Sequence, residues 1–108
     1  MGTELIDRRI RKTRKQLKDC LISLLKTKRI QDITVRELTE MADLNRGTFY
    51  LHYKDVFDLL EQTETELLGK LNSVIQKHRA EELLDRPFNI FHEVYTLVYE
   101  NASLVEIL

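Results

Sequence analysis

The sequence predicts an all-α fold, and three observations support that prediction. Only 3 of the 108 residues are Gly and one is Pro, so few positions favour turns or interrupt a helix. No segment alternates strictly between apolar and polar residues, whereas apolar residues recur at steps of three and four. Hydrophobic residues make up 43% of the chain, which is enough for a small core. The length suits one compact domain and a fragment of a second.

A first helix is expected over about residues 5–28, because an apolar stripe with helical spacing runs along it. The stripe consists of Ile6, Ile10, Leu17, Cys20, Leu21 and Leu24, with Thr13 filling a gap. A competing start exists, since Thr13-Arg-Lys-Gln16 reads as a capping box that would leave residues 1–12 as a loose basic arm. The extension of the stripe back to Ile6 favours the longer helix.

A polar connector, "TKRIQDI", leads to a short helix predicted over about residues 35–42. Thr34 is expected to cap the N–H of Glu37, and the Glu37 side chain is expected to reach back to the Thr34 N–H. Ile33 and Leu38 hold the positions of a hydrophobic staple on either side of this cap.

The same pattern repeats after a sharp turn of three residues, Asp43, Leu44 and Asn45. Asn45 is a good cap for a helix over about residues 46–53, with Leu44 and Phe49 as its staple. Asp43 occupies a position where a turn this tight favours a left-handed residue, commonly Gly. Two short helices joined by such a turn form a helix-turn-helix.

A long helix is expected from Asp55, with Asp58 in the box position, to about residue 82. Arg86-Pro87 marks its break. A helix over about 88–100 follows, and Ser103 is expected to cap a last short helix that stops at Leu108. The apolar face of the long helix is Val56, Leu60, Leu67, Leu71, Val74, Ile75 and His78. The apolar side of the next is Phe88, Phe91, Val94, Tyr95 and Val98.

Basic residues are concentrated in the first part of the chain, although the whole chain carries a net charge of −1. Residues 1–60 hold 13 basic and 9 acidic side chains, whereas residues 61–108 hold 4 basic and 9 acidic ones. The densest basic block runs from Arg8 to Lys18, with seven Lys or Arg and no acid. A basic first part of the chain (the head) followed by an acidic second part (the body) predicts that the head binds a polyanion. A solvated helix face explains such a basic block equally well.

The helix over 46–53 presents an unusual outer face. A helical wheel turns Phe49 and Tyr53 toward the core, with His52 near their edge. The opposite side carries Gly47, Tyr50, Leu51 and Lys54, with Thr48 between the two sides. A solvated face would normally carry Glu, Lys or Gln, so these residues predict a contact surface. The alternative is that Gly47 is incidental and Tyr50 packs on a neighbouring helix.

The chemistry of this face suits DNA. The helix start offers backbone N–H groups to an anion, and Gly47 lets the backbone approach a phosphate or base edge. Arg46 can pair bidentately with guanine or bind phosphate, and Thr48 can meet a thymine methyl or a phosphate. Further contacts are expected from Tyr50, His52 and Lys54 to phosphates and from Arg36 to the groove.

Other classes of protein lack support in the sequence. No Ser-His-Asp, Cys-His or Gly-rich phosphate-loop pattern appears, so the chain is not expected to be an enzyme or to hold a cofactor. His78 with Glu81 or Glu82 has the spacing of a helical metal pair without a third ligand, so no metal is expected. Cys20 excludes an intrachain disulfide, is expected to be buried, and fits a reducing cytosol. The chain lacks a membrane span and a signal peptide, so we expect a cytoplasmic protein.

The segment "ITVRELTEMADLNRGTFYLHYKD" resembles the DNA-binding domain of the TetR family of bacterial transcriptional repressors. The likeness lies in "ITV" before the first short helix, "A-x-L-N-R-G-T-F-Y" across the turn and second helix, and "HYKD" after it. It spans about residues 8–62. It implies a three-helix DNA-binding head, a homodimer on a palindromic operator, and a helical body that binds a small-molecule effector.

The resemblance assigns DNA contacts by position to Thr34, Arg36, Asn45, Arg46, Gly47, Thr48, Tyr50, His52 and Lys54. The basic residues Arg8, Arg9, Arg11 and Lys12 are further candidates for the DNA backbone. Two positions depart from the family, which commonly has Gly in place of Asp43 and often a phosphate-binding Lys in place of Val56. Lys54 is expected to replace the latter contact in part.

These observations divide the chain into a helix-turn-helix DNA-binding domain (residues 1–54) and a linking helix with an incomplete ligand-binding and dimerisation domain (55–108). Family members usually continue well past this point, so the body is expected to be partial, and exposed apolar sides of its helices would favour self-association. The rival interpretation is a helical protein-binding module that does not contact DNA. Salt dependence separates the two, because DNA affinity falls steeply as salt rises.

Overall fold

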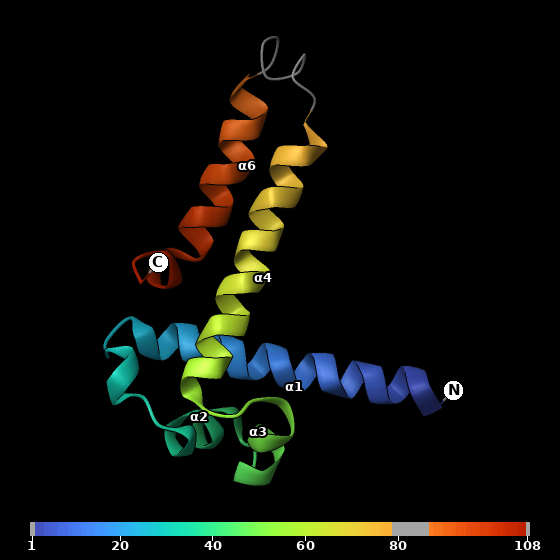
Figure 1. Ribbon diagram of the computed structural model, residues 1–108, viewed down its shortest axis with the longest axis vertical. Coiled ribbons are helices and arrows are strands. Elements are labelled where there is room, and N and C mark those ends of the chain that lie inside the picture. The colour runs from blue at the N-terminus through green and yellow to red at the C-terminus, as the bar shows by residue number, and fades with distance from the viewer. Residues whose placement is uncertain (1, 79–86, 108) are drawn as a thin grey trace. The chain divides into compact units, whose positions relative to one another are not determined.

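The computed structural model describes residues 2–78 and 87–107, and within these ranges the chain forms helices and no strands. The α-helices are α1 (Gly2–Leu25), α2 (Val35–Ala42), α3 (Arg46–His52), α4 (Val56–Lys77), α6 (Pro87–Glu100) and α7 (Ala102–Val105), and a 3-10 turn, η1 (Ile30–Asp32), precedes α2 (Figure 1). The all-α prediction is confirmed. The chain divides into two compact units, Met1–Glu61 and Gln62–Leu108.

The first unit is built on a core that α1, α2, α3 and the start of α4 share. α1 packs against α2, and α2 packs against α3. The side chains that are buried in this unit include Leu17, Cys20, Leu21, Ile33, Leu38, Phe49, Tyr53, Val56 and Leu59. Both residues of the first predicted staple, Ile33 and Leu38, are among them.

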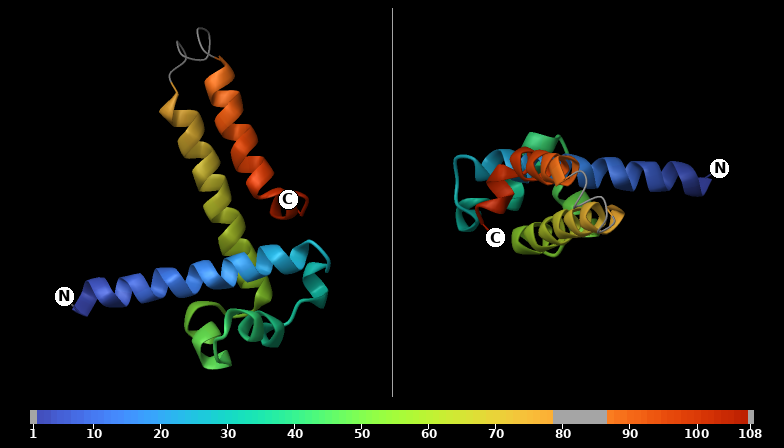
Figure 2. Two further views of the ribbon diagram at one scale, coloured as in Figure 1. Left: turned by 180° about the vertical axis from the view of Figure 1, so that it is seen from behind. Right: turned by 90° about the horizontal axis from the view of Figure 1, so that it is seen from above.

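The longer of the two expected forms of the first helix is confirmed, since α1 begins at Gly2. The expected apolar stripe is only half buried, however, because Ile6 and Ile10 are exposed. Both views in Figure 2 show the reason: the amino-terminal turns of α1 project beyond α2 and α3, so nothing in the first unit covers them. α1 also ends three residues earlier than predicted, and the N–H of Lys28 closes the final turn on the Leu24 carbonyl at 2.9 Å.

α2 has the predicted bounds, and its cap makes contacts beyond the predicted ones. The Thr34 hydroxyl accepts from the Glu37 N–H at 3.1 Å, as expected. The Glu37 carboxylate also accepts from the Thr34 hydroxyl at 3.3 Å and pairs with Lys28. Hydrogen bonding from Lys28 is the main cause that lowers the pKa of Glu37, and a hydrogen bond from the Thr34 backbone, the predicted reciprocal contact, lowers it further. The cap thereby also ties α2 to the turn that follows α1.

The turn between α2 and α3 confirms the predicted left-handed residue, because Asp43 has φ 56° and ψ 47°. The N–H of Leu44 donates to the Thr39 carbonyl at 2.9 Å, and that of Asp43 donates to the Glu40 carbonyl at 3.3 Å. This is the Schellman arrangement that ends many helices. It stops α2 at Ala42 and redirects the chain into α3 within three residues.

The second unit contains the rest of α4, together with α6 and α7. α4 and α6 lie side by side and antiparallel in Figures 1 and 2. Near the end of α4, Lys77 Nζ lies 3.5 Å and His78 Nε2 lies 3.3 Å from Glu93 Oε1 on α6. α4 ends at Lys77 and His78 forms a bend, whereas the predicted continuation over residues 79–82 lies outside the described residues, as does Arg86.

The apolar side predicted for α6 is wrong in most of its members. Residues Phe88, Phe91, Tyr95 and Val98 are exposed, whereas Ile90 is buried. The reason lies in the sequence "PFNIFHEVYTLVYE", which is apolar around most of the helix, so its periodicity does not single out one side. Packing within the unit decides instead. Two pairs of rings stack along the exposed side, Phe88 with His92 and Tyr95 with Tyr99.

The last helix also differs from its prediction, because Ser103 lies inside α7 and does not cap it. Asn101 occupies the cap position, but its side chain turns backward and donates to the Leu97 carbonyl at 2.8 Å. α7 is short, Ala102–Val105, and Leu104 anchors it as a fully buried side chain.

The left-handed conformation of Asp43 predicts how substitutions at this position change the free energy of unfolding. A Cβ in this conformation is strained, so Asp43→Gly is expected to be more stable than Asp43→Ala by about 1 kcal/mol, after allowance for the greater freedom of unfolded Gly. The wild type should fall between them, since Asp tolerates this conformation better than Ala. Urea unfolding followed by circular dichroism measures the order. Equal stability of the Gly and Ala variants would contradict the prediction.

Candidate nucleic-acid interface

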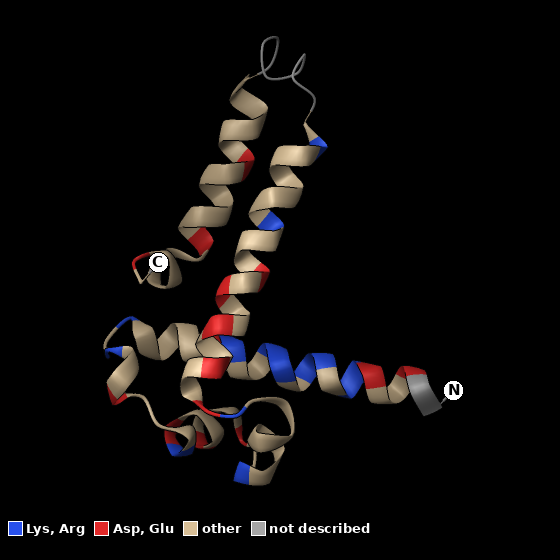
Figure 3. Ribbon diagram, in the orientation of Figure 1, with Lys and Arg blue, Asp and Glu red and all other residues tan. Residues whose placement is uncertain are grey.

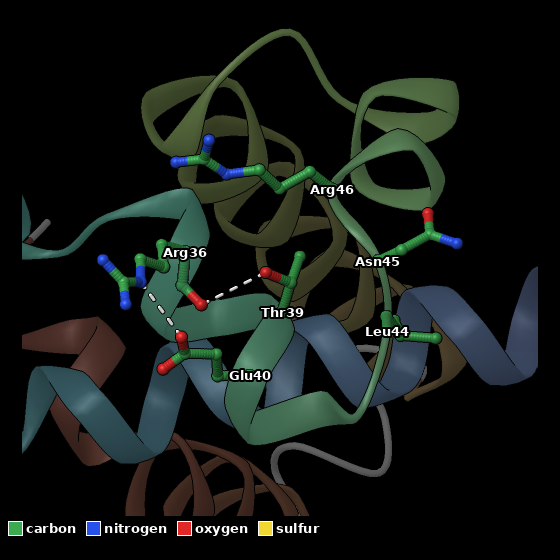
Figure 4. A pocket seen from close by; sticks show the side chains of 6 residues that line it. All are labelled: Arg36, Thr39, Glu40, Leu44, Asn45 and Arg46. Atoms are coloured by element: carbon green, nitrogen blue, oxygen red, sulfur yellow. Dashed lines mark hydrogen bonds and ion pairs between the residues drawn. The ribbon is translucent and has the colours of Figure 1, made fainter.

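The start of α3 is held by the predicted cap. Asn45 Oδ1 accepts from the Thr48 N–H at 2.8 Å and from the Thr48 hydroxyl at 3.0 Å. One amide oxygen therefore fixes both the backbone and the side chain of Thr48. The Asn45 amide nitrogen is left on the outer side of the turn (Figure 4).

The burial of α3 follows the predicted wheel. Phe49 is fully buried and Tyr53 is 3% exposed, whereas Tyr50 is 55% and Leu51 is 82% exposed. The Tyr50 ring stands edge-on to the buried Phe49 ring, with 5.4 Å between ring centroids. The outer face also includes the exposed residues Arg46, Gly47 and Lys54. An aromatic ring and a large aliphatic side chain are thus held in solvent, which is unusual for a short surface helix.

Gly47 keeps the first turn of α3 narrow. Its backbone does not need a glycine, because φ is not positive there. A Cβ at this position would lie 3.3 Å from Asn45 Oδ1, which is tighter than ordinary contact. The absence of a side chain therefore leaves the cap undisturbed and lets a binding partner approach the backbone.

The other end of α3 is tied to α1 through Arg14. Arg14 Nε donates to His52 Nδ1 at 3.5 Å, and the Arg14 guanidinium lies over the Tyr53 ring, 5.7 Å from its centroid. Burial and, secondarily, the charge of Arg14 lower the pKa of His52. His52 is half-buried at the edge of the outer face, as predicted.

A surface hollow of about 400 Å³ lies where α2 meets the start of α3. It is lined by Arg36, Thr39, Glu40, Leu44, Asn45 and Arg46 (Figure 4). Arg36 Nε donates to Glu40 Oε1 at 3.0 Å. The Thr39 hydroxyl turns back into its own helix and donates to the Val35 carbonyl at 2.9 Å. Two arginines and one carboxylate therefore provide the charge at the rim, an arrangement that can bind phosphates and the acceptor-rich edge of guanine.

The structure brings most of the predicted site residues together on the helix-turn-helix. Arg36, Asn45 and Arg46 line the hollow, and Gly47, Thr48, Tyr50, His52 and Lys54 follow along or just after α3. Thr34 is exposed at the cap of α2. The four basic residues Arg8, Arg9, Arg11 and Lys12 lie elsewhere, on the projecting part of α1, where Figure 3 shows a run of Lys and Arg.

Two residues near this surface, Glu40 and Arg14, were not among the predicted site residues, although Arg14 belongs to the basic block from Arg8 to Lys18. Glu40 follows Arg36 by four residues on a helix, and this spacing is a usable signal for an ion pair. Arg14 meets His52 across 38 residues of sequence. No local sequence pattern predicts that contact, because it depends on how α1 packs beside α3.

Glu81 and Glu82, the candidate partners of His78, lie outside the described residues. Across residues 2–78 and 87–107, His, Cys, Asp and Glu do not gather in groups of three that could hold a metal ion. Cys20 is buried as expected, and burial, with the nearby Asp19 charge, raises its pKa. None of the helices in the described ranges has the length and apolar character needed to cross a membrane.

Comparison with known proteins agrees with this architecture. No family model matches the chain. Over 96 residues the chain is 31% identical to an uncharacterised HTH-type transcriptional regulator, YxbF, of Bacillus subtilis strain 168. The match covers 86% of this chain and 25% of that protein, so the chain spans about a quarter of the length of its curated relative. The likeness supports a helix-turn-helix regulator family for the chain.

The environment of His52 predicts a pH dependence of stability. Its pKa is lowered in the folded chain, so the unfolded chain binds a proton first as the pH falls. The free energy of unfolding should therefore decrease from about pH 7.5 through the ordinary histidine pKa of about 6.5. His52→Asn keeps an acceptor near the Nδ1 position and removes the titration, so its decrease should be smaller. Urea unfolding at several pH values checks this, and equal pH slopes for the two proteins would contradict it.

Proposed function

We propose that this chain binds double-stranded DNA sequence-specifically as the DNA-binding part of a transcriptional regulator. The observation that carries the proposal is the outer face of α3. This face exposes Gly47, Tyr50 and Leu51, whereas Phe49 and Tyr53 on the opposite side anchor the helix in the core. A second short helix presented in this way by a helix-turn-helix has the shape that enters a major groove.

The side chains around α3 divide into two kinds of contact. Arg46 and Arg36 are exposed at the hollow and have the chemistry to read a base edge. Tyr50, His52 and Lys54 follow toward the end of the helix, where phosphate contacts would set its position along the groove. Thr34, Thr48 and the Asn45 amide nitrogen complete the proposed contact set.

The basic segment of α1 supports the same partner. Arg8, Arg9, Arg11 and Lys12 are exposed on a helix that projects from the first unit (Figure 3). We assign these residues to the DNA backbone, because clustered basic side chains on one helix neutralise phosphates without reading sequence.

The finer features of the proposal come from the TetR-like motif. They are repression, a homodimer on a palindromic operator, a small-molecule effector, and a DNA-binding domain over residues 1–54 joined to a partial body over 55–108. α4 contributes residues to both compact units, which supports a role for it in transmitting effector binding. The curated relative is itself named a transcriptional regulator of the helix-turn-helix type.

The proposal is tested by selecting duplexes from a randomised pool with the purified chain and then measuring affinity against salt concentration. We expect enrichment of a two-fold symmetric sequence with half-sites about 34–36 Å apart. The logarithm of affinity should fall with the logarithm of salt concentration by about 0.9 for each phosphate contact. Flat salt dependence and no retention on a DNA column would favour a protein-binding module instead.

The effector is tested separately, by measuring affinity for the selected duplex with and without candidate small molecules. A shift in affinity supports ligand-responsive regulation. Constant affinity across a broad set of compounds would remove the effector from the proposal while leaving DNA binding intact.

Arg46 and Lys54 should respond differently to substitution. Arg46→Ala is expected to weaken binding to the selected duplex by about 1–3 kcal/mol, with little effect on random DNA, because a base reader is lost. Lys54→Ala should weaken binding to all sequences and reduce the salt slope by about one, because a phosphate contact is lost. Fluorescence anisotropy on both duplexes measures these effects. Equal losses on every sequence for Arg46→Ala would reassign Arg46 to the backbone.

A further inference from the structure

Glu40 is an acidic side chain within a surface that is otherwise suited to a polyanion. Its carboxylate shares the rim of the hollow with Arg36 and Arg46 (Figure 4). The Arg36 and Glu40 side chains are 75% and 66% exposed, and their ion pair measures 3.0 Å. An approaching phosphate would therefore meet a negative charge next to the cation that attracts it.

The geometry of the pair restrains one part of the Arg36 guanidinium and leaves another for a partner. Glu40 Oε1 accepts from Nε of Arg36. The two terminal Nη groups form the fork that matches the O6 and N7 acceptors of guanine. A carboxylate that accepts from Nε limits the directions in which this fork can point.

Stability does not explain the pair well. Exposed ion pairs four residues apart on a helix contribute little to the free energy of unfolding. α2 already has its Thr34 cap and its fully buried Leu38. Loss of the Glu40 charge should therefore leave the fold intact, and any effect on binding can be measured separately.

We propose that Glu40 is a positioning residue that sets DNA specificity in two ways, an inference that rests on the proposed DNA-binding function. Glu40 holds the Arg36 guanidinium in a direction from which it reads a base edge. Its charge also disfavours the alternative in which Arg36 moves to any nearby phosphate. The carboxylate weakens binding to all DNA, whereas the oriented arginine strengthens binding only to the cognate site.

The test replaces Glu40 with Gln, which keeps the shape and removes the charge. We expect Glu40→Gln to bind random duplex more tightly than the wild type, with a salt slope about one unit steeper. The ratio of affinities for the selected and random duplexes should fall about fivefold to tenfold. Glu40→Asp, which retains a carboxylate within reach of Arg36, should recover much of this ratio.

Asp19→Asn provides the matched control. Asp19 accepts from Lys15 Nζ at 2.9 Å in another exposed pair four residues apart, and its replacement changes the net charge by the same amount. This variant should alter both affinities by the same factor and leave their ratio unchanged. Circular dichroism and thermal unfolding of each variant confirm that the fold is retained.

A second measurement reports the orientation of the Arg36 guanidinium rather than the charge of Glu40. Selection from the randomised pool with Glu40→Gln should recover sites with a relaxed preference at one base pair in each half-site. If the wild type binds the selected duplex while Glu40→Gln keeps both its affinity ratio and its base preferences, the role of Glu40 is overturned and DNA binding stands. If the wild type binds no duplex at all, the proposed function fails, and this inference fails with it.

Discussion

The burial of Phe49 and Tyr53 beneath α3 is the constraint on which the rest of the first unit depends. α3 has seven residues, too few for a helix to persist in water without tertiary contacts. Its two aromatic anchors are four residues apart and occupy one side of the helix, so the opposite side is forced outward. The exposure of Gly47, Tyr50 and Leu51 is thus a consequence of packing and not a separate feature. Any partner of α3 meets a face whose orientation the core has already determined.

The parts of the fold that were predictable from sequence are those governed by short-range chemistry. The bounds of α2 follow from a capping threonine and a left-handed Asp43, and the start of α3 follows from the Asn45 cap. The failures occur where a distant surface decides the outcome. Ile6 and Ile10 continue a correct helical stripe but extend past the helices that could bury them, and the exposed side of α6 is as apolar as its packed side. Periodicity identifies a helix reliably, but it identifies the buried side only when the other sides are polar.

The candidate site shows the same division between local and distant information. Its cationic members, Arg36 and Arg46, are recognisable from residue type and position in the helix-turn-helix. Glu40 was within reach of the same reasoning, because its four-residue spacing from Arg36 places the two side chains together. The role of Arg14 could not be inferred in this way, since its contact with His52 and Tyr53 requires α1 to pass beside the end of α3. A search for cations alone therefore finds where a polyanion would bind and misses Glu40, the carboxylate that pairs with Arg36.

The distribution of charge over the first unit suits a division between affinity and specificity. The basic block on α1, from Arg8 to Lys18, contains no acidic side chain, and contacts from such a helix would strengthen binding to every sequence alike. The hollow between α2 and α3 instead combines two arginines with a carboxylate. If the surface that contacts the bases carried only positive charge, most of the free energy of binding would come from phosphate contacts. The cognate sequence would then bind little more tightly than other sequences. Under the proposed function, a carboxylate beside Arg36 and no acid in the α1 block would separate the two contributions, so that the attraction to DNA as a polymer would arise away from the residues that would distinguish one sequence from another.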